Sequence, residues 1–304
     1  MTTYRLGLLG YPLAHSLSPR LHMAALEHMQ LEGRYDLFPF PPGEAGVKGI
    51  QGLIAQLREG ELHGLNVTVP HKMALLPYLD ELTPTAQAIG AVNALRLQAG
   101  KVLGDNFDYP AFIQDLTQQL TQVGAAGLLG RPNLPGRTAL VLGAGGSARA
   151  VVYGLLSQGW QVLLASRRLE QAQQLARAFP MFPTARSCGL NALPGFDLAG
   201  LNLVVNTTPL GMFPEIGSSA WPAGLPFPSA AFVYDLVYSP PETAWLRSAR
   251  MAGLRTANGL GMLVKQAAMS FHSWTGLEPP LEAMYRSVSP VYLQNKPANP
   301  STLP

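Results

Sequence analysis

Two ionisable residues, Lys72 and Asp108, stand where the sequence could handle a proton. Lys72 follows the apolar run Leu65–Val69 and Pro70, at the opening of the next expected helix, where a cation is unfavourable for the helix dipole. Asp108 stands directly before the expected helix Tyr109–Val123. A carboxylate beside an ammonium group would orient it, and the pair could deliver a proton or stabilise negative charge. The alternatives are a solvated surface lysine and an aspartate that only caps its helix.

Two serines in one loop, Ser16 and Ser18, could bind an anion. They follow the apolar run Arg5–Leu9, and Pro19 is well suited to begin a helix directly after them. Both hydroxyls can point at one carboxylate, which the helix dipole would also stabilise. The alternative role of Ser18 is that of an ordinary helix N-cap.

A glycine-rich turn follows the apolar run Thr138–Leu142 with the spacing of a dinucleotide-binding fingerprint. Gly143 permits the tight turn, Gly145 lets the backbone approach a pyrophosphate, and Ala148 allows helix and strand to pack closely. Unpaired N–H groups at the start of the helix Ser147–Leu156 favour phosphate. The other predicted cofactor-binding residues of this turn are Ala144, Gly146 and Ser147.

The end of the next expected strand, Gln161–Ala165, indicates which dinucleotide is bound. An NAD-binding fold places an acidic residue on the ribose about 20 residues beyond the glycines. This chain has Ser166, Arg167 and Arg168 there, and no acid before Glu170. Because a guanidinium pairs well with a 2′-phosphate, NADP(H) is predicted. The alternative is a solvated basic turn.

The composition limits the class of protein. The chain has 304 residues, 47% of them apolar and 13% charged, with a formal net charge of +3. Its basic residues are scattered, so no nucleic-acid partner is expected. No apolar stretch approaches the roughly 20 residues that cross a bilayer, and no signal peptide is evident, so we expect a cytoplasmic protein without membrane contact. The single cysteine, Cys188, fits a reducing compartment, and no metal site is expected.

Short apolar runs alternate with helical patterns, which predicts a parallel α/β architecture in two units. In the first unit the expected strands are 5–9, 35–38, 65–69, 91–97 and 102–103, and the helices 19–29 and 47–57. A helix at 109–123 and a Gly/Pro-rich loop at 124–136 follow. In the second unit the expected strands are 138–142, 161–165, 203–206 and 232–236, and the helices 147–156, 170–179, 242–251 and 261–275.

Two further segments carry weaker signals. Asn206–Met212 follows an expected strand, at the edge where open α/β sheets bind ligands, and the alternative is a capped turn. The proline-containing end, 291–304, is expected to be a loosely attached extension.

Taken together, these motifs resemble the shikimate dehydrogenase family over nearly the whole chain, from Gly7 to about Gly276. The resemblance is carried by blocks in a fixed order, which include the Asp108 segment and the glycine turn. The other blocks are His15–Pro19, Asn66–Pro70, Gly90–Asn93, Asn206–Met212, Tyr234–Tyr238 and Gly259–Ala267.

The resemblance implies an activity and a set of site residues. The activity is the reversible NADPH-dependent reduction of 3-dehydroshikimate to shikimate, in chorismate and aromatic amino-acid biosynthesis. Lys72 and Asp108 would be the catalytic pair. The substrate would be surrounded by Ser16, Ser18, Thr68, Lys72, Asn93, Asp108, Tyr238 and Gln266. Beyond the glycine turn, the cofactor would be contacted by Ser166, Arg167, Arg168, Asn206, Thr207, Thr208, Leu236, Gly259 and Met262.

The resemblance also implies the domain organisation. An N-terminal substrate-binding α/β sandwich, residues 1–108 with 259–290, would face a Rossmann NADP-binding domain, residues 109–258, across a cleft. Three residues depart from the family pattern: Met23 replaces a usual Asn, while Phe107 and Arg168 each replace a Thr. Phe107 could alter the hydrogen bonds that position Asp108, and Arg168 adds positive charge for a 2′-phosphate.

Two other functions stay open. A quinate/shikimate dehydrogenase would typically favour NAD through an acidic residue, which the segment Ser166–Arg168 argues against. A non-catalytic NADP-binding regulator on the same scaffold would not need both Lys72 and Asp108. A homodimer is compatible with the sequence, which leaves the oligomeric state open.

Overall fold

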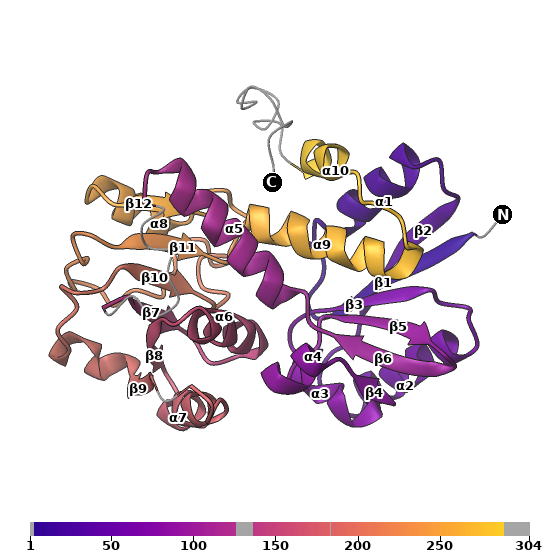
Figure 1. The fold of residues 1–304 in the computed structure, drawn as a ribbon, viewed down its shortest axis with the longest axis horizontal. Coiled ribbons are helices and arrows are strands. Elements are labelled where there is room, and N and C mark those ends of the chain that lie inside the picture. The colour runs from indigo at the N-terminus through magenta and orange to yellow at the C-terminus, as the bar shows by residue number, and fades with distance from the viewer. Residues whose placement is uncertain (1–2, 126–135, 183, 289–304) are drawn as a thin grey trace.

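The computed structural model describes residues 3–125, 136–182 and 184–288. Within these residues the chain forms two α/β lobes, each around a six-stranded sheet, and the helices α5 (Asp108–Gln122) and α9 (Leu260–Thr275) extend between them (Figure 1). The expected two-lobe α/β fold is confirmed. Most of the expected loop 124–136, and all of the extension 291–304, lie outside the described residues. No helix in the described ranges has the length and apolar character needed to cross a membrane.

The sheet of the first lobe has the order β2-β1-β3-β5-β6-β4. Its central strand, β1 (Tyr4–Gly10), pairs in parallel with β2 (Gly33–Pro39) on one side and with β3 (Gly64–Val67) on the other. This arrangement brings the carboxyl ends of β1 and β3 to the same edge of the sheet. The serine loop follows β1 there, and the segment that leads to Lys72 follows β3.

The sheet of this lobe is rich in parallel pairs, as the expected parallel α/β architecture requires, but it also contains antiparallel pairs. β5 (Ala94–Gln98) is antiparallel to both β3 and β6 (Lys101–Asp105), and only the short β4 (Glu81–Leu82) continues in parallel with β6. The antiparallel pairing of β5 with β6 has a local cause, because Ala99 and Gly100 between them both have positive φ angles, 50° and 76°. Two residues of positive φ make the tight turn of a hairpin, which forces its two strands to be antiparallel.

Helices cover both faces of the first sheet. On one face, α1 (Ser18–His28) and α9 pack together, and Val264, Ala267 and Phe271 of α9 share a core with Leu6 of β1. The opposite face carries the apolar side of α2 (Glu44–Arg58). The remaining helices around this lobe are α3 (His71–Ala74), α4 (Pro84–Ile89) and α10 (Leu281–Val288), with a 3₁₀ turn at Leu76–Tyr78.

The second lobe has the parallel sheet β12-β11-β10-β7-β8-β9. The first strand of this sheet in the sequence is β7 (Thr138–Leu142). The next strand, β8 (Gln161–Ser166), pairs with one side of β7, and the later β10 (Leu203–Asn206) pairs with its other side. The end of β7 is therefore the topological switch point at which such sheets bind ligands. The other strands are β9 (Ala185–Gly189), β11 (Phe232–Asp235) and β12 (Arg255–Ala257). The helices are α6 (Gly146–Ser157), α7 (Leu169–Arg177) and α8 (Ala244–Met251), with a 3₁₀ helix at Leu190–Gly195.

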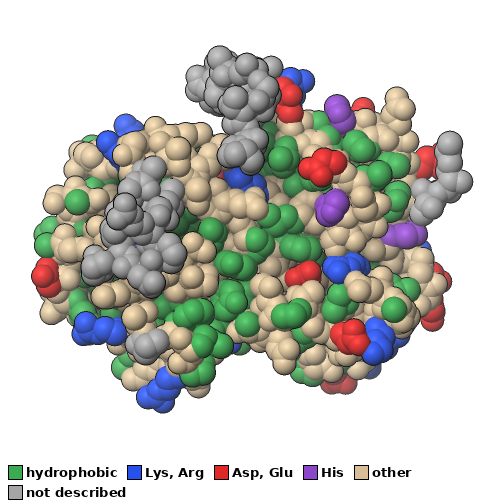
Figure 2. Space-filling model, in the orientation of Figure 1, with side chains coloured by type: hydrophobic (Ala, Val, Ile, Leu, Met, Phe, Trp, Pro, Cys, Tyr) green, Lys and Arg blue, Asp and Glu red, His purple; other side chains and the backbone are tan. Residues whose placement is uncertain are grey.

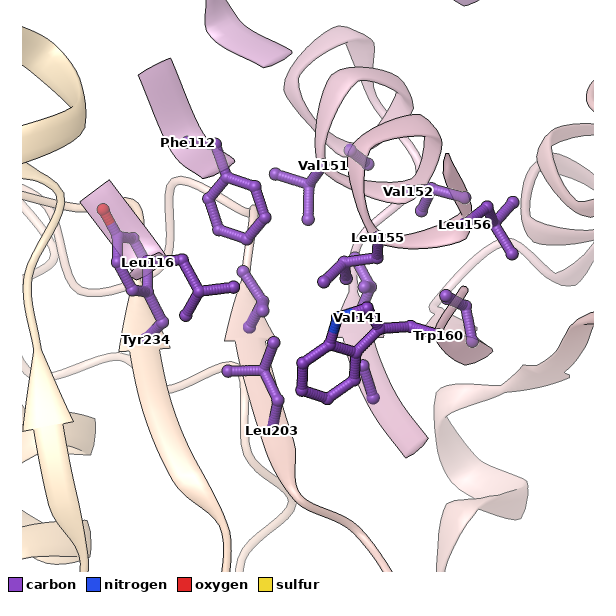
Figure 3. Close-up of a cluster of buried hydrophobic side chains, with 14 of the residues drawn as sticks. Phe112, Leu116, Val141, Val151, Val152, Leu155, Leu156, Trp160, Leu203 and Tyr234 are labelled. Atoms are coloured by element: carbon purple, nitrogen blue, oxygen red, sulfur yellow. The ribbon is translucent and has the colours of Figure 1, made fainter. Parts of the chain in front are cut away.

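A large apolar core fixes α6, and with it the glycine turn, on the second sheet. Figure 3 shows Val151 and Leu155 of α6 packed over Val141 of β7, with the fully buried Trp160 beside them. Phe112 and Leu116 of α5 enter the same cluster, so the helix that begins with Asp108 is fixed to the second lobe by apolar burial.

A buried ion pair ties α5 to α9. Lys265 Nζ lies 2.7 Å from Asp115 Oδ1, and Tyr234 of β11 donates its hydroxyl hydrogen to Asp115 Oδ2 at 2.6 Å. Burial lowers the pKa of Lys265, but the nearby Asp115 carboxylate and Tyr285 outweigh it, and the net pKa lies above the ordinary value. Asp115 is only 1% exposed, so these partners satisfy the hydrogen-bonding needs of its buried carboxylate.

We predict that Asp115→Ala will lower the free energy of unfolding by about 3–5 kcal/mol, because it leaves a buried ammonium group without its counter-charge. Arg34→Ala is the control, since it breaks the exposed 2.8 Å pair with Asp36. That change should cost less than about 1 kcal/mol. Urea denaturation measures both variants, and equal small losses would contradict a structural role for Asp115.

Candidate active site

Lys72 and Asp108 form a buried ion pair between the lobes. Lys72, in α3, places Nζ 2.5 Å from Asp108 Oδ2, and the two residues are only 8% and 4% exposed. Lys72 Nζ also lies 3.2 Å from the hydroxyl oxygen of Ser147, in the first turn of α6. Asp108 begins α5, but its side chain makes no capping hydrogen bond there. The alternatives of a solvated lysine and a helix-capping aspartate are therefore wrong.

Amide side chains extend this pair into a hydrogen-bonded chain. Asn93 donates from Nδ2 to Asp108 Oδ1 at 2.9 Å and, at 3.4 Å, to Oε1 of Gln266 on α9. The Asn93 side-chain carbonyl oxygen in turn accepts from the backbone N–H of Phe107 at 2.7 Å. Since Phe107 makes this bond through its backbone, the departure from Thr leaves it in place. Asn93, Asp108 and Gln266, on three separate segments, thus meet beside Lys72.

The serine loop lies at the start of α1 and contacts the second lobe. Ser18 is the first residue of α1, and no side chain caps that helix, so the N-cap alternative is wrong. The Ser16 hydroxyl oxygen accepts from the N–H of Ser18 at 3.3 Å. Burial raises the pKa of Tyr238, while hydrogen bonds with the Leu17 backbone and the Ser16 side chain partly offset the effect. Tyr238 and the two predicted serines therefore form one polar group.

An aromatic contact joins the same loop to the second lobe. The rings of His15 and Phe213 meet edge to face, with centroids 4.5 Å apart. Phe213 follows the segment Asn206–Met212 and is 57% exposed, so the contact lies at the rim. Together with Tyr238, Phe213 holds the serine loop against the second lobe.

Two buried polar residues beside this loop are absent from the predicted site. The Tyr35 hydroxyl donates to Asn66 Oδ1 at 2.9 Å, and burial raises the Tyr35 pKa well above its ordinary value although a hydrogen bond with Ser18 opposes it. Asn66 also donates to Ser270 of α9 at 2.8 Å. Asn66 could have been found, because it stands in the same block as Thr68. Tyr35 gave no signal, since an aromatic residue in a strand predicts only core packing.

A cavity of about 450 Å³ opens between the lobes at the glycine turn. Gly143 has a φ of +111°, which favours glycine, and an added Cβ would lie 2.6 Å from the Thr207 hydroxyl oxygen. No side chain caps α6, and an added Cβ at Gly145 would meet no atom within 4 Å. Free N–H groups beside open space fit a pyrophosphate. The predicted site residues that line this cavity are Lys72, Gly143, Ala144, Gly145, Gly146, Ser147, Ser166, Arg167, Arg168, Thr207 and Thr208.

The end of β8 supplies positive charge to the same cavity. The Ser166 hydroxyl oxygen accepts from the N–H of Arg168 at 3.3 Å, which shapes the turn. Arg167 and Arg168 are exposed, and neither forms an ion pair with another residue that the structure describes. Two guanidinium groups without counter-charges at the end of the second strand fit a 2′-phosphate.

Some predicted cofactor residues lie away from this cavity. Asn206 is fully buried, donates to Asp235 Oδ1 at 2.8 Å and accepts from the Thr208 hydroxyl at 2.7 Å, so it positions Thr208. The other predicted residues that do not line the cavity are Ala148, Leu236, Gly259 and Met262. Conversely, Arg149, Gln171 and Gln174 line it but were not predicted. Arg149 directly follows the fingerprint, which was the available signal.

A larger hollow, of about 720 Å³, lies elsewhere, on the face formed by α5 and α9. Its lining includes Phe107, Met269 and Leu281, and Figure 2 shows hydrophobic side chains gathered near the middle of this face. None of the predicted site residues lines it. Size alone therefore does not identify the active site, because the ion pair and the glycine turn both lie at the smaller cavity.

Comparisons with known proteins agree with this geometry. The models of a shikimate dehydrogenase substrate binding domain and a shikimate 5′-dehydrogenase C-terminal domain match residues 8–95 and 259–288. A shikimate dehydrogenase (NADP(+)) from Salinibacter ruber is 40% identical, over 93% of this chain and 96% of its own. The chain belongs to the shikimate dehydrogenase family.

Solved structures of the family share the fold. A shikimate 5-dehydrogenase from Thermus thermophilus, in complex with NADP(H) and shikimate, superposes with a TM-score of 0.77 at 36% identity, covering 94% of this chain and 98% of that one. A quinate dehydrogenase from Corynebacterium glutamicum, in complex with NAD, gives a TM-score of 0.79 at 30% identity, covering 94% and 98%. The fold alone therefore does not distinguish the two activities.

The carboxyl group of Asp235, which is fully buried and accepts from Asn206, should make the stability depend on pH. Burial raises its pKa from 3.8 to about 6, although hydrogen bonds from Val237 N–H, Thr243 and Asn206 oppose the shift. The folded protein therefore keeps this proton at a pH where the unfolded chain has lost it. The stabilisation is complete below about pH 3.8 and is lost as the pH rises through about 6, by about 3 kcal/mol in all.

We predict that Asp235→Asn will remove this pH dependence. Urea denaturation of the parent and the variant between pH 4 and 7 measures it. The free energy of unfolding of the parent should fall relative to that of the variant as the pH rises. A difference that stays constant across this range would show that Asp235 ionises normally in the folded protein.

Proposed function

We propose that this protein is an NADP-dependent shikimate dehydrogenase, which reversibly reduces the ring ketone of 3-dehydroshikimate to the alcohol of shikimate. One observation carries the proposal: the buried Lys72–Asp108 pair of one lobe is hydrogen-bonded to Ser147 of the glycine turn in the other. A proton-handling pair thus directly adjoins a dinucleotide cavity. Family membership and the names of the relatives support the same substrate, and hence a place in chorismate and aromatic amino-acid biosynthesis.

In the proposed mechanism, NADPH supplies the hydride when bound. Lys72 donates a hydrogen bond to the substrate ketone oxygen, stabilises the negative charge that grows there, and delivers the proton. Asp108 orients the Lys72 ammonium group and accepts from a ring hydroxyl. Asn93, which also contacts Gln266, positions Asp108, and the two amides bind the ring together with Thr68.

The two ends of the site hold anionic groups. Ser16, Ser18 and Tyr238 bind the substrate carboxylate at the start of α1. The free N–H groups of α6 hold the cofactor pyrophosphate, and Arg167 and Arg168 hold its 2′-phosphate. Closure of the lobes around both ligands excludes water from the reacting atoms.

We also propose the domain division 1–108 with 259–290 and 109–258. The two separate sheets support it, as does the packing of α9 on β1 and α1. We further propose a cytoplasmic location and a homodimer, and light scattering of the purified chain tests the dimer.

A quinate dehydrogenase and a non-catalytic NADP-binding regulator are the competing functions. Initial rates with shikimate and with quinate, each with NADP+ and NAD+, separate all three. The proposal expects the highest kcat/KM for shikimate with NADP+. Preference for quinate with NAD+ would favour the first competitor, and no turnover with any pair would favour the second.

Lys72→Met should lower kcat by a factor of about 10²–10⁴, because it removes the proton donor that acts in the transition state. The KM for shikimate should change only several-fold. Steady-state kinetics measure both constants, and a thermal unfolding curve checks that the variant is folded. A folded variant with near-normal kcat would refute the role of Lys72.

Arg167→Ala should raise the KM for NADP+ by roughly 10- to 100-fold, as expected when a charge-assisted hydrogen bond is lost. The KM for NAD+ should stay unchanged, since NAD+ has no 2′-phosphate. Arg177→Ala is the matched control, an arginine in the last turn of α7 that does not line the cavity. Equal effects on the two cofactors would contradict the phosphate contact.

A further inference from the structure

Lys72 contacts the glycine turn of the second lobe and lines the dinucleotide cavity. Besides Asp108, its ammonium group donates to the Ser147 hydroxyl oxygen at 3.2 Å. Its aliphatic stem lies against the same turn, because an added Cβ at Gly146 would be 2.9 Å from Lys72 Cβ. The catalytic side chain of one lobe therefore rests on the phosphate-binding turn of the other.

The hydroxyl of Ser147 can serve both sites at once. A hydroxyl has one hydrogen to donate and two lone pairs to accept. Ser147 uses a lone pair for Lys72 and keeps its hydrogen for an acceptor in the cavity that it lines. A phosphate oxygen at the N-terminus of α6 is such an acceptor.

We propose that Ser147 is a positioning residue that couples dinucleotide binding to the position of Lys72. This inference rests on the proposed function. When a phosphate accepts the Ser147 hydrogen, the hydroxyl is fixed with a lone pair toward Lys72, and hydrogen bonds in such a chain strengthen one another. Lys72 is then ordered before the substrate arrives, so the substrate binds more tightly to the dinucleotide complex than to the free protein.

The coupling must be reciprocal. If the dinucleotide tightens substrate binding by a given factor, the substrate tightens dinucleotide binding by the same factor. A fragment without nicotinamide isolates the contribution of Ser147, because it cannot touch the substrate through that ring. The probe is 2′-phospho-ADP-ribose, which keeps the pyrophosphate and the 2′-phosphate and cannot react.

The experiment is calorimetric titration of shikimate into the free enzyme and into enzyme saturated with 2′-phospho-ADP-ribose. In the parent, the fragment should lower the Kd for shikimate by about fivefold or more. In Ser147→Ala this factor should fall to less than about twofold, as expected when the bridging hydrogen bond is lost. Ser157→Ala is the control, since that hydroxyl lies at the far end of α6 and donates to the Gly154 carbonyl oxygen at 2.9 Å. In Ser157→Ala, the fragment should lower the Kd for shikimate by the same factor as in the parent.

A double-mutant cycle with Lys72→Met separates coupling from a merely structural effect. Once Lys72 is replaced, removing the Ser147 hydroxyl should not change the factor by which 2′-phospho-ADP-ribose lowers the Kd for shikimate. The inference is overturned if the parent shows no coupling, if Ser147→Ala couples like the parent, or if the serine change has the same effect without Lys72. NADP+ reduction by shikimate, measured in parallel, shows which proposal fails. Turnover without coupling overturns only this inference, whereas absence of both shikimate binding and turnover overturns the proposed function as well.

Discussion

The arrangement of the site between the lobes depends on one buried pair of charges, Lys72 and Asp108. Removing both from water carries a large desolvation penalty, which their attraction repays only if further hydrogen bonds satisfy them. Those bonds come from Asn93 in the first lobe and Ser147 in the second. The pair is therefore stable only while the lobes lie together, and it gives no advantage to folding that well-packed apolar residues would not give. Its chemistry is the physical reason for keeping it there.

The packed helices α5 and α9 fix the position of this pair relative to the second lobe. Asp108 and Asp115 are seven residues apart on α5, so they lie on nearly the same face, about 10 Å apart along the helix axis. Each is connected to one of two adjacent residues of α9. Asp108 is linked to Gln266 through Asn93, and Asp115 forms an ion pair with Lys265 directly. A single pair of packed helices thus contributes residues both to the Asp115–Lys265 ion pair and to the hydrogen-bonded side chains of the site. A shift of one helix along the other would disrupt both at once.

The sequence predicted the elements that obey a strong period or a turn signature, and it missed those set by pairing across the sheet. The glycine turn, α6 and α9 could be predicted because glycine spacing and helical periodicity are local properties. The strands β4 and β12 could not, since they have only two and three residues, and β9 (Ala185–Gly189) could not, since it contains no apolar run. The hairpin Ala99–Gly100 was missed because alanine gives no warning of a positive φ.

The same distinction applies to the site. Lys72 and Asp108 could be proposed because a lysine at the start of a helix is unfavourable for the helix dipole and a nearby carboxylate could orient it, whereas Tyr35 has an ordinary structural role in β2. The role of Asn206 could not be assigned from its place in the sequence either. Its side chain is buried and positions Thr208 by a hydrogen bond. In the proposed function, cofactor choice and chemistry are separated in space, because Arg167 and Arg168 follow β8 while Lys72 belongs to α3 in the other lobe. A residue such as Ser147, which lies between the two, is one that cannot change without affecting both.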